Sequence, residues 1–481
     1  MIFLFYKVII NIVSSTNELY KKKGEITMEK KELGLFRVAT LGIGGMLGSG
    51  IFIMMGYGTA FAGRSTSLAF IACVFMMTMA YAFNWVLGSM FKLKGGSYEQ
   101  MIFLCPPVVS GFYGVSYFIG STAIAAYGIS LVDFVGKIFP QVLPYKVILA
   151  VLVATLFFAL SIKGIGFMTY IQSAMTVIMI VALGMFVILG LPKVQPGYFT
   201  DPGFFQGGPV GFLSAVSVVS FACMGTTAAP VSVAYETKKA TKTVPLATLI
   251  IAVAIAAIYS LMAVVFTGVL PIEQVMGQDL SAVAEVIFPR WFYVFFILGG
   301  AVFAIATSLL GNIVMMRYPI LSSAEDGWLP KVLAKTTKTG FPWVTTLIMY
   351  LCAIVPIILG ISIDTLVSYV MIPQLVIVVL ANAMMFTIPK KYPEQWKKSV
   401  LHMPYPLFCV LVVVSILSSI VLICFMYLGL GQAVVPTLIM TAVLFAYTYM
   451  RMKTGAVDLE KVEANKRAVI EAALAEDKEN V

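Results

Sequence analysis

"GIGGMLGSGIF" (residues 42–52) lies inside a hydrophobic segment, yet five of its residues are glycines. Glycine weakens a helix because it keeps more backbone freedom in the unfolded chain than any other residue. The surrounding segment, 36–62, carries a formal charge only at Arg37 and is long enough to cross a lipid bilayer. An unpaired backbone group inside a bilayer costs several kcal/mol. A membrane helix broken by glycines therefore predicts a binding site whose ligand is held by exposed backbone groups.

The composition predicts an all-α polytopic membrane protein. Of 481 residues, 60% are hydrophobic and 11% are charged, and the mean hydropathy is +0.98. A membrane-spanning helix needs about 20 apolar residues, and runs of this length recur along the whole chain. We expect about twelve transmembrane helices, near residues 36–62, 66–91, 108–136, 146–162, 168–191, 211–235, 246–270, 291–318, 343–361, 365–388, 405–428 and 433–450.

Lysine and arginine set the expected orientation of these helices. With a cytoplasmic N-terminus, the inner loops hold most of the basic residues, as in 238–242 and 390–398, and the outer loops hold few. The positive-inside rule then predicts a multi-pass protein of the cell membrane with both termini in the cytoplasm. The net charge of +10 indicates contact with anionic membrane lipid and not with nucleic acid. The sequence does not fix an oligomeric state.

The two ends of the chain lie outside the predicted membrane region. Residues 1–32 form an expected cytoplasmic tail. Within it, 1–27 are interpreted as an upstream start-site extension, because "MEKKELGLF" from Met28 resembles a natural start. A mobile tail that touches the membrane is the alternative. Residues 452–481 mix both charge signs with alanine, which predicts a solvated, partly helical cytoplasmic tail without a specific function.

Residue types typical of enzymes are scarce. The single histidine, His402, lies in a predicted loop, and the six cysteines show no spacing typical of a metal site or a disulfide framework. No GxxxxGK[ST] nucleotide-binding loop is present in the sequence. We therefore expect neither an enzyme nor an ATP-driven pump, and no cofactor or metal.

A second helix break is expected in the span near 211–235. There "FLSAVSVVSFACMGTTAAPVSVAYE" (212–236) contains Gly225 and then Pro230, which removes a backbone donor and clashes with the preceding turn. Paired breaks in corresponding spans of inverted repeats mark the binding sites of secondary transporters. Free N–H groups of one half-helix attract a carboxylate, and free carbonyls of another attract an ammonium or a cation. The two stretches predict a transport site, with plain helix packing as the alternative.

Five stretches of the chain, in order, resemble motifs of the amino acid–polyamine–organocation (APC) family of transporters. They are GMLGSGIF at 45–52, GGSYEQ at 95–100, YETKKATKTVPLA at 235–247, NIVMMRYPILSSAEDGWLP at 312–330 and FPWVT at 341–345. The resemblance covers nearly all of the chain from Leu33 to Arg451. It implies a LeuT-type fold in which a transporter core, 33–388, holds two inverted five-helix repeats, at 33–192 and 211–388, with discontinuous helices 1 and 6. Two accessory transmembrane helices follow within 389–451.

The resemblance also implies where an amino acid or a related amine would bind. Its carboxylate would meet backbone amides around Gly48, Ser49 and Gly50, assisted by the Ser49 hydroxyl. The ammonium would meet carbonyls near Met46, Phe221, Ala222 and Met224. Gly225, Thr226 and Asn312 are the other residues expected to bind the substrate. For Asn312, capping of a helix kink is the alternative.

Three residues are candidates for gating. Phe118 and Phe221 fall where related transporters carry aromatic gates, and core packing is the alternative for both. Glu236 is expected at the inner end of its span, where it would pair with Lys238, Lys242 or Arg317 as part of an inner gate; simple solvation is the alternative.

Departures from the family pattern bear on substrate and coupling. Met179 stands where proton-coupled members carry a lysine, so we expect amino acid exchange, with a proton- or sodium-coupled symporter as the alternative. Thr226 and Thr227 replace an acidic residue, which favours a neutral or apolar amino acid. A channel and a transport-incompetent sensor of the same fold are less favoured. Arg64 stands where proline is common, and the sequence does not explain it.

Overall fold

The structure, a computed structural model, describes residues 33–93, 96–162, 165–338, 340–361, 363–430 and 434–479. Within these ranges the protein is helical, apart from one isolated β-bridge between Leu33 and Thr237. The interpretation of residues 1–27 as a start-site extension lies outside the described residues.

The helices follow one another closely along the chain. In order they are α2 (Leu35–Met46), α3 (Ser49–Ala62), α4 (Thr66–Ala80), α5 (Ala82–Gly88), α6 (Gly96–Leu104), α7 (Pro107–Gly120), α8 (Ile124–Gly136), α9 (Lys146–Ser161), α10 (Ile165–Gly190), α11 (Gly208–Val218), α12 (Gly225–Ser232), α13 (Ala240–Val269), α14 (Ile272–Val275), α15 (Leu280–Ile287), α16 (Arg290–Phe295), α17 (Phe303–Glu325), α18 (Trp343–Leu359), α19 (Ile363–Met384), α20 (Ile388–Lys391), α21 (Pro393–Lys398), α22 (Tyr405–Leu430), α23 (Val434–Lys453) and α24 (Leu459–Glu479). Short 3-10 turns connect several of them, including η1 (Gly63–Ser65), η2 (Ser121–Ala123), η5 (Val219–Cys223) and η6 (Ala234–Glu236), and η7 (Phe296–Val302) is a π-helical turn.

Ten helical stretches of the described chain are long and apolar enough to cross a membrane, so the protein is a polytopic membrane protein. This number of spans is lower than the about twelve predicted from the sequence. The bounds of the helices give two reasons. The glycine break leaves α2 with 12 residues, and the stretch Gly50–Ala80 joins α3 to α4 through η1. The predicted ninth span is α18, which has 17 residues.

The spans differ in how deeply they are buried. In the most apolar 18 residues of each span, 67% are buried for Pro107–Gly136 and Arg290–Glu325, but only 22% for Pro140–Ser161 and 17% for Val435–Lys453. The exposed positions of the peripheral helices carry large apolar side chains such as Leu152. Apolar surface of this extent suits lipid and not water. The helices around α8 and α17 therefore form the interior of the bundle.

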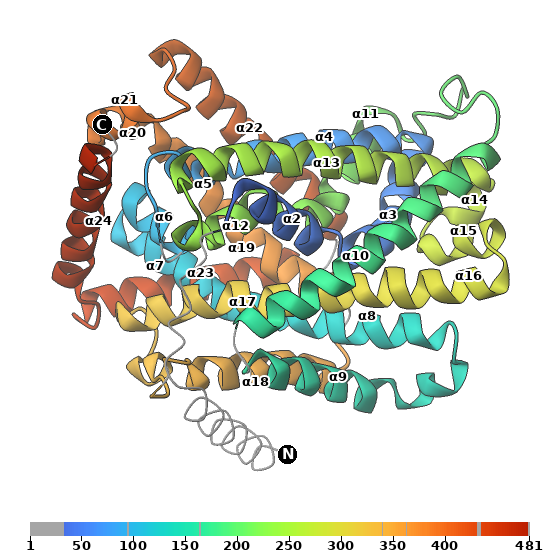
Figure 1. Cartoon of the computed structure of the whole chain (residues 1–481), viewed down its shortest axis with the longest axis horizontal. Coiled ribbons are helices and arrows are strands. Elements are labelled where there is room, and N and C mark those ends of the chain that lie inside the picture. The colour runs from blue at the N-terminus through green and yellow to red at the C-terminus, as the bar shows by residue number, and fades with distance from the viewer. Residues whose placement is uncertain are drawn as a thin grey trace.

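The two broken helices lie within this bundle and are held by long neighbours. Helix α13 packs along α4 and α2, and α11 packs along α3 and α22. Figure 1 shows α13 running beside α4 across the bundle, with α2 and α12 close to its middle. The interrupted segments are thus enclosed by continuous helices.

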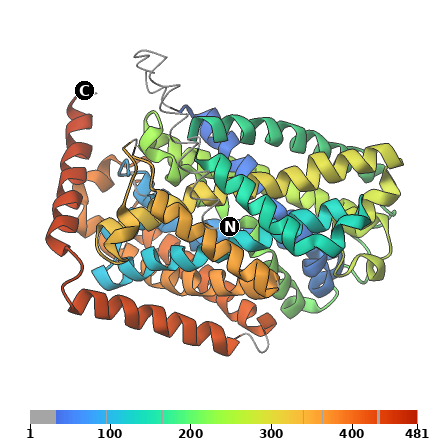
Figure 2. The ribbon, with the colours of Figure 1, turned by 90° about the horizontal axis from the view of Figure 1, so that it is seen from below.

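The C-terminal segment is packed against the bundle and not free. Arg451 Nη2 donates to the carbonyl oxygens of Gly327 and Leu329, at 2.5 and 3.3 Å, and the amide of Asp458 donates to the carbonyl of Asp326. Val457 is buried. Helix α24 then lies across one end of the bundle, as both views show (Figures 1 and 2). The short link around Val457 is therefore held by the bundle, whereas most described residues of α24 are exposed, in agreement with a solvated, partly helical tail.

Candidate substrate-binding site

The glycine cluster ends one helix and begins another. Helix α2 ends at Met46, Leu47 and Gly48 leave the helical path, and α3 begins at Ser49. Gly48 is extended, with φ −120° and ψ −160°, and its N–H donates to the carbonyl of Met46 at 2.6 Å. The first N–H groups of a helix have no intrahelical partner, and Gly48 offers no side chain to cap them. The side chain of Ser49, and with it the predicted role of its hydroxyl, lies outside what the structure describes.

The second break is milder than the first. Helix α11 ends at Val218 and continues as the 3-10 turn η5, and α12 begins at Gly225. Met224, between them, keeps helical angles of φ −65° and ψ −28°. A 3-10 turn is tighter than an α-helix and has poorer hydrogen-bond geometry, so its carbonyls are less completely satisfied. Pro230 lies inside α12, after the break and not at it.

The two breaks touch each other. A Cβ atom added to Gly50 would lie 2.6 Å from the Cα atom of Ala222, and one added to Gly225 would lie 3.0 Å from Cγ of Met46. A Cβ atom on Gly48 would collide with the Ser308 hydroxyl of α17. Gly50 requires glycine because its neighbour is backbone, and only a residue without a side chain allows such close approach. At Gly225 the neighbour is the flexible side chain of Met46, which needs to give way by only a few tenths of an ångström.

Tyr259 of α13 bridges the two breaks. Its hydroxyl donates to the carbonyl of Met46 at 2.5 Å and lies 3.3 Å from the carbonyl oxygen of Ala222. The side chain is fully buried, and its ring packs edge-on against Phe70, with centroids 5.4 Å apart. Met46 and Ala222, both predicted from the family resemblance, are thus linked through a residue that was not predicted.

A row of side chains runs from the second break to α17. The rings of Phe221 and Tyr127 stack, with centroids 6.3 Å apart and 23° between their planes. The amide nitrogen of Asn312 donates to the Tyr127 hydroxyl at 3.2 Å and to the carbonyl of Ser308 at 2.9 Å. Asn312 therefore both caps a helical carbonyl and contacts the aromatic pair. Phe118, in α7, is partly buried and packs against the apolar core.

The hydroxyls of Thr226 and Thr227 are engaged within the protein. The Thr226 hydroxyl donates to the carbonyl of Cys223 at 2.8 Å, and the amide of Asn84 donates to the Thr227 hydroxyl at 3.0 Å. Both threonines are 1% exposed. They fill the space beside the break without bringing charge to it.

Glu236 lies away from this site. It is exposed in η6, and its backbone carbonyl accepts a hydrogen bond from the amide of Leu33. Among the described residues Glu236 forms none of the predicted ion pairs. Arg317 is buried instead against α9 and the loop before α18, where it donates to the Ser161 hydroxyl at 2.6 Å and lies 4.8 Å from the ring centroid of Phe341. Arg317 and Glu236 are therefore not paired in this structure, and the inner gate that would close in the outward-facing state stays a prediction.

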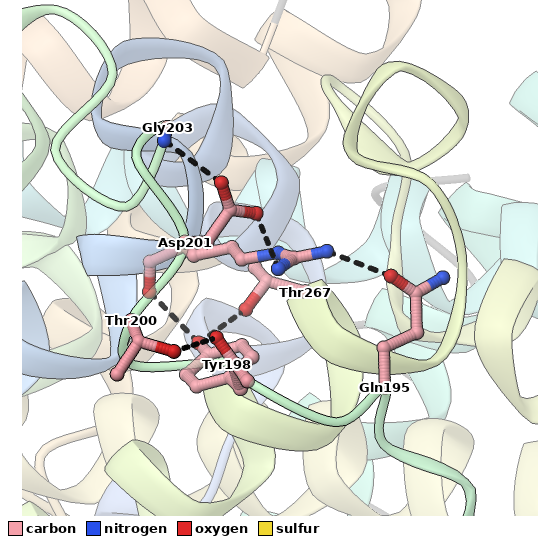
Figure 3. Close-up of polar contacts among 8 residues, drawn as sticks. Gln195, Tyr198, Thr200, Asp201, Gly203 and Thr267 are labelled. Atoms are coloured by element: carbon pink, nitrogen blue, oxygen red, sulfur yellow. Dashed lines mark hydrogen bonds and ion pairs between the residues drawn. The ribbon is translucent and has the colours of Figure 1, made fainter.

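Arg64 follows the far end of α3, within η1. Figure 3 shows Gln195, Tyr198, Asp201 and Thr267 of the polar cluster to which it belongs. The Arg64 guanidinium pairs with Asp201 at 2.5 Å, donates to Gln195 at 2.8 Å and lies 5.6 Å from the ring centroid of Tyr198. The Tyr198 hydroxyl donates to the Arg64 carbonyl and is hydrogen-bonded to Thr267 at the end of α13. Burial raises the pKa of the Tyr198 phenol, so this hydroxyl remains protonated at neutral pH. The cluster ties α3 to the segment that leads into α11.

Comparison with known proteins identifies the class of protein to which this geometry belongs. The sequence profile of the family described as "Amino acid permease" matches residues 33–450. The chain belongs to the amino acid permease family. The branched-chain amino acid permease BcaP of Bacillus subtilis is 25% identical to this permease over 394 residues, covering 76% of this chain and 82% of the relative. The lysine-specific permease LysP of Lactococcus lactis is 24% identical over 381 residues, covering 72% and 71%. A vacuolar cationic amino acid transporter 2 of Arabidopsis thaliana is 24% identical over 353 residues, covering 66% and 53%.

Membership of the family confirms the APC resemblance and identifies the permease as a transporter of amino acids and not an enzyme. The names of the relatives include branched-chain, lysine and cationic amino acids, so the family sets the class of substrate but not the individual amino acid.

Three residues that shape the site of the permease were not predicted from the sequence: Tyr127, Ser308 and Tyr259. A tyrosine hydroxyl inside a membrane span needs a hydrogen-bond partner, and this need was the available signal. It does not identify the partner, because a tyrosine that bridges two helices and one that only fills the core look alike in sequence.

Proposed function

We propose that this permease is a secondary carrier that moves amino acids across the cell membrane by alternating access, as an exchanger, with both termini in the cytoplasm. In this proposal its core has a LeuT-type arrangement of two inverted five-helix repeats, residues 33–192 and 211–388, followed by two accessory helices within 389–451. The observation that carries the proposal is the contact between the two helix breaks, where Gly50 meets Ala222. Two interrupted helices that touch in this way bring amides and carbonyls of helix ends to one place.

The amino acid binds between these groups. Its carboxylate accepts hydrogen bonds from the amides of residues 49 and 50, at the N-terminal end of α3, where the helix dipole favours negative charge. The Gly48 amide keeps its bond to the Met46 carbonyl. The ammonium of the amino acid donates to carbonyls of residues 46, 221, 222 and 224, at the end of α2 and between α11 and α12. Binding by backbone explains why the residues at the contact are small. Phe221 and Asn312 then lie where they would meet the substrate side chain, and Phe221 also acts as a gate.

A neutral, apolar amino acid is the proposed substrate. The side chains beside the breaks are aromatic, hydroxyl or amide groups, and among the described residues none that they contact by hydrogen bond or ring stacking is acidic. A lysine or arginine substrate would find no carboxylate there. The branched-chain amino acid specificity in the name of the Bacillus subtilis relative agrees with this assignment.

Exchange is favoured over coupling to protons because Met179, buried in α10, offers no titratable group at the position where proton-coupled members carry a lysine. A proton- or sodium-coupled symporter is the alternative. It would drive uphill uptake when a proton or sodium gradient is imposed on vesicles without internal amino acid.

Counterflow in proteoliposomes tests the proposal. Vesicles that contain the purified permease and unlabelled leucine are diluted into labelled leucine, and exchange predicts transient accumulation of label that saturates with concentration. Valine and isoleucine should compete, and lysine should not. Flux that rises without saturation would indicate a channel, and the absence of both binding and exchange would indicate a sensor.

A further inference from the structure

The carbonyl of Met46 is already fully used by protein donors. It accepts one hydrogen bond from the Tyr259 hydroxyl at 2.5 Å and another from the amide of Gly48 at 2.6 Å. A carbonyl oxygen has two lone pairs, so both acceptor positions are occupied. A substrate ammonium gains this carbonyl only if one donor leaves it.

Of the two donors, only Tyr259 has another acceptor within reach. The Gly48 amide is part of the backbone and is held by the turn between α2 and α3. The Tyr259 hydroxyl carries one proton that rotates about its C–O bond, and the carbonyl oxygen of Ala222 lies 3.3 Å from the hydroxyl oxygen. The proton therefore moves from the Met46 carbonyl to the Ala222 carbonyl without a change in the position of the ring.

The surroundings of Tyr259 favour a switch of the proton over a movement of the side chain. The residue is fully buried, and its ring packs against Phe70 of α4 at 5.4 Å. A close-packed ring keeps its place, whereas a hydroxyl hydrogen turns freely. Both acceptors belong to the broken helices, one to the end of α2 and one to η5.

We propose that Tyr259 is a positioning residue that stands in for the substrate ammonium: its hydroxyl satisfies the Met46 carbonyl when no amino acid is bound and turns to the Ala222 carbonyl when the ammonium arrives. The inference rests on the proposed function, because it requires an ammonium group to bind at the helix breaks. Tyr259 then competes with every ligand that carries an ammonium, and it does not compete with ligands that lack one.

The test is to measure the dissociation constants of three ligands for purified Tyr259→Phe and for the wild type: leucine, its decarboxylated amine isopentylamine, and its deaminated analogue 4-methylpentanoate. Phenylalanine keeps the ring and removes the competing donor. We expect leucine and the amine to bind more tightly, by up to about five-fold, the net worth of one hydrogen bond. The empty site loses the 2.5 Å bond to Met46, whereas the occupied site loses only the 3.3 Å bond to Ala222. The affinity for 4-methylpentanoate should change by less than about two-fold, within ordinary variation between similar variants.

Tyr350→Phe is the matched control. Tyr350 is a buried tyrosine of α18, away from the helix breaks, and its hydroxyl lies 2.9 Å from the hydroxyl of Thr155 in α9. It should leave all three affinities unchanged. If Tyr259→Phe does not fold, 3-fluorotyrosine inserted at position 259 replaces it: the fluorinated phenol is a stronger donor and should weaken binding of the two ammonium ligands only.

Two outcomes are separable. The first concerns Tyr259, in a wild type that binds and exchanges leucine. Its role is contradicted if folded Tyr259→Phe binds leucine and the amine equally well or more weakly. It is also contradicted if all three ligands gain equally. Absence of leucine binding and exchange in the wild type contradicts the proposed function itself.

Discussion

Gly50→Ala is expected to impair transport, whereas Gly45→Ala, the same change five residues earlier, is expected to be tolerated. The added methyl at position 50 would lie 2.6 Å from Cα, 2.8 Å from Cβ and 3.2 Å from the amide nitrogen of Ala222. Ordinary contact begins near 3.4 Å, so α3 and η5 would have to separate by about 0.8 Å. At position 45 the nearest atom is Nε2 of Gln172, at 4.0 Å, and the methyl has room.

The size of the effect follows from this overlap. Overpacking a filled site costs about 1–3 kcal/mol. If that strain is relieved only by moving the amides of α3 away from the carbonyls of η5, leucine binding weakens by about five- to 150-fold, at 1.36 kcal/mol for each factor of ten. Helix propensity does not offset this loss, because alanine is favoured over glycine by no more than about 1 kcal/mol.

Leucine titrations followed by thermal shift give the affinities of both variants, and counterflow gives their exchange rates. Binding raises the melting temperature by mass action, so the unliganded melting temperatures report folding separately. Wild-type affinity in Gly50→Ala, or an equal loss in Gly45→Ala, would refute the view that the contact between the breaks forms the site.

Other contacts lead to three further predictions. Arg64→Gln removes the ion pair with Asp201 and should lower the melting temperature by about 1 °C for each kcal/mol lost, at an unfolding entropy of about 2 cal/mol/K per residue, with Asp201→Asn giving a similar change. Arg451→Ala removes hydrogen bonds to backbone carbonyls after α17 and should expose the segment before α24 to limited proteolysis; an unchanged cleavage pattern would contradict the packing described. Burial raises the pKa of Asp326, an effect that its hydrogen bond from Tyr98 only partly opposes, so folding favours the protonated acid. The contribution of Asp326 to stability should therefore fall as pH rises from about 4, the ordinary value, through the raised value, and Asp326→Asn should flatten that slope in thermal-shift measurements.

The first helix break was predictable because its cause is local. A run of glycines weakens a helix wherever it occurs, and α2 ends within the run. The second break shows the limit of such reasoning. Gly225 and Pro230 drew attention to the correct span, but the departure from α-helix is the 3-10 turn η5, which precedes both. Backbone geometry there depends on contact with α3, which a local sequence pattern does not contain.

The remaining differences also come from partners distant in sequence. Tyr259 lies 213 residues from Met46, and Arg64 lies 131 residues from Gln195, so nothing near either residue reveals its partner. The tail after α23 carries the mixed charges of a solvated segment, yet its Asp458 amide donates to the carbonyl of Asp326, which becomes available only where α17 ends. The pairing of Glu236 with Arg317 was predicted from their opposite charges. In the structure Arg317 instead contacts Ser161 at the end of α9 and Phe341 before α18.

The most direct test of the account is an experimental structure of the permease with bound leucine, at a resolution that orients the amino acid. We expect its carboxylate within hydrogen-bond distance of the amides of residues 49 and 50 and its ammonium within reach of the carbonyls of residues 46 and 222. Leucine bound away from both breaks, or α2 and α3 joined in one unbroken helix around it, would contradict the account.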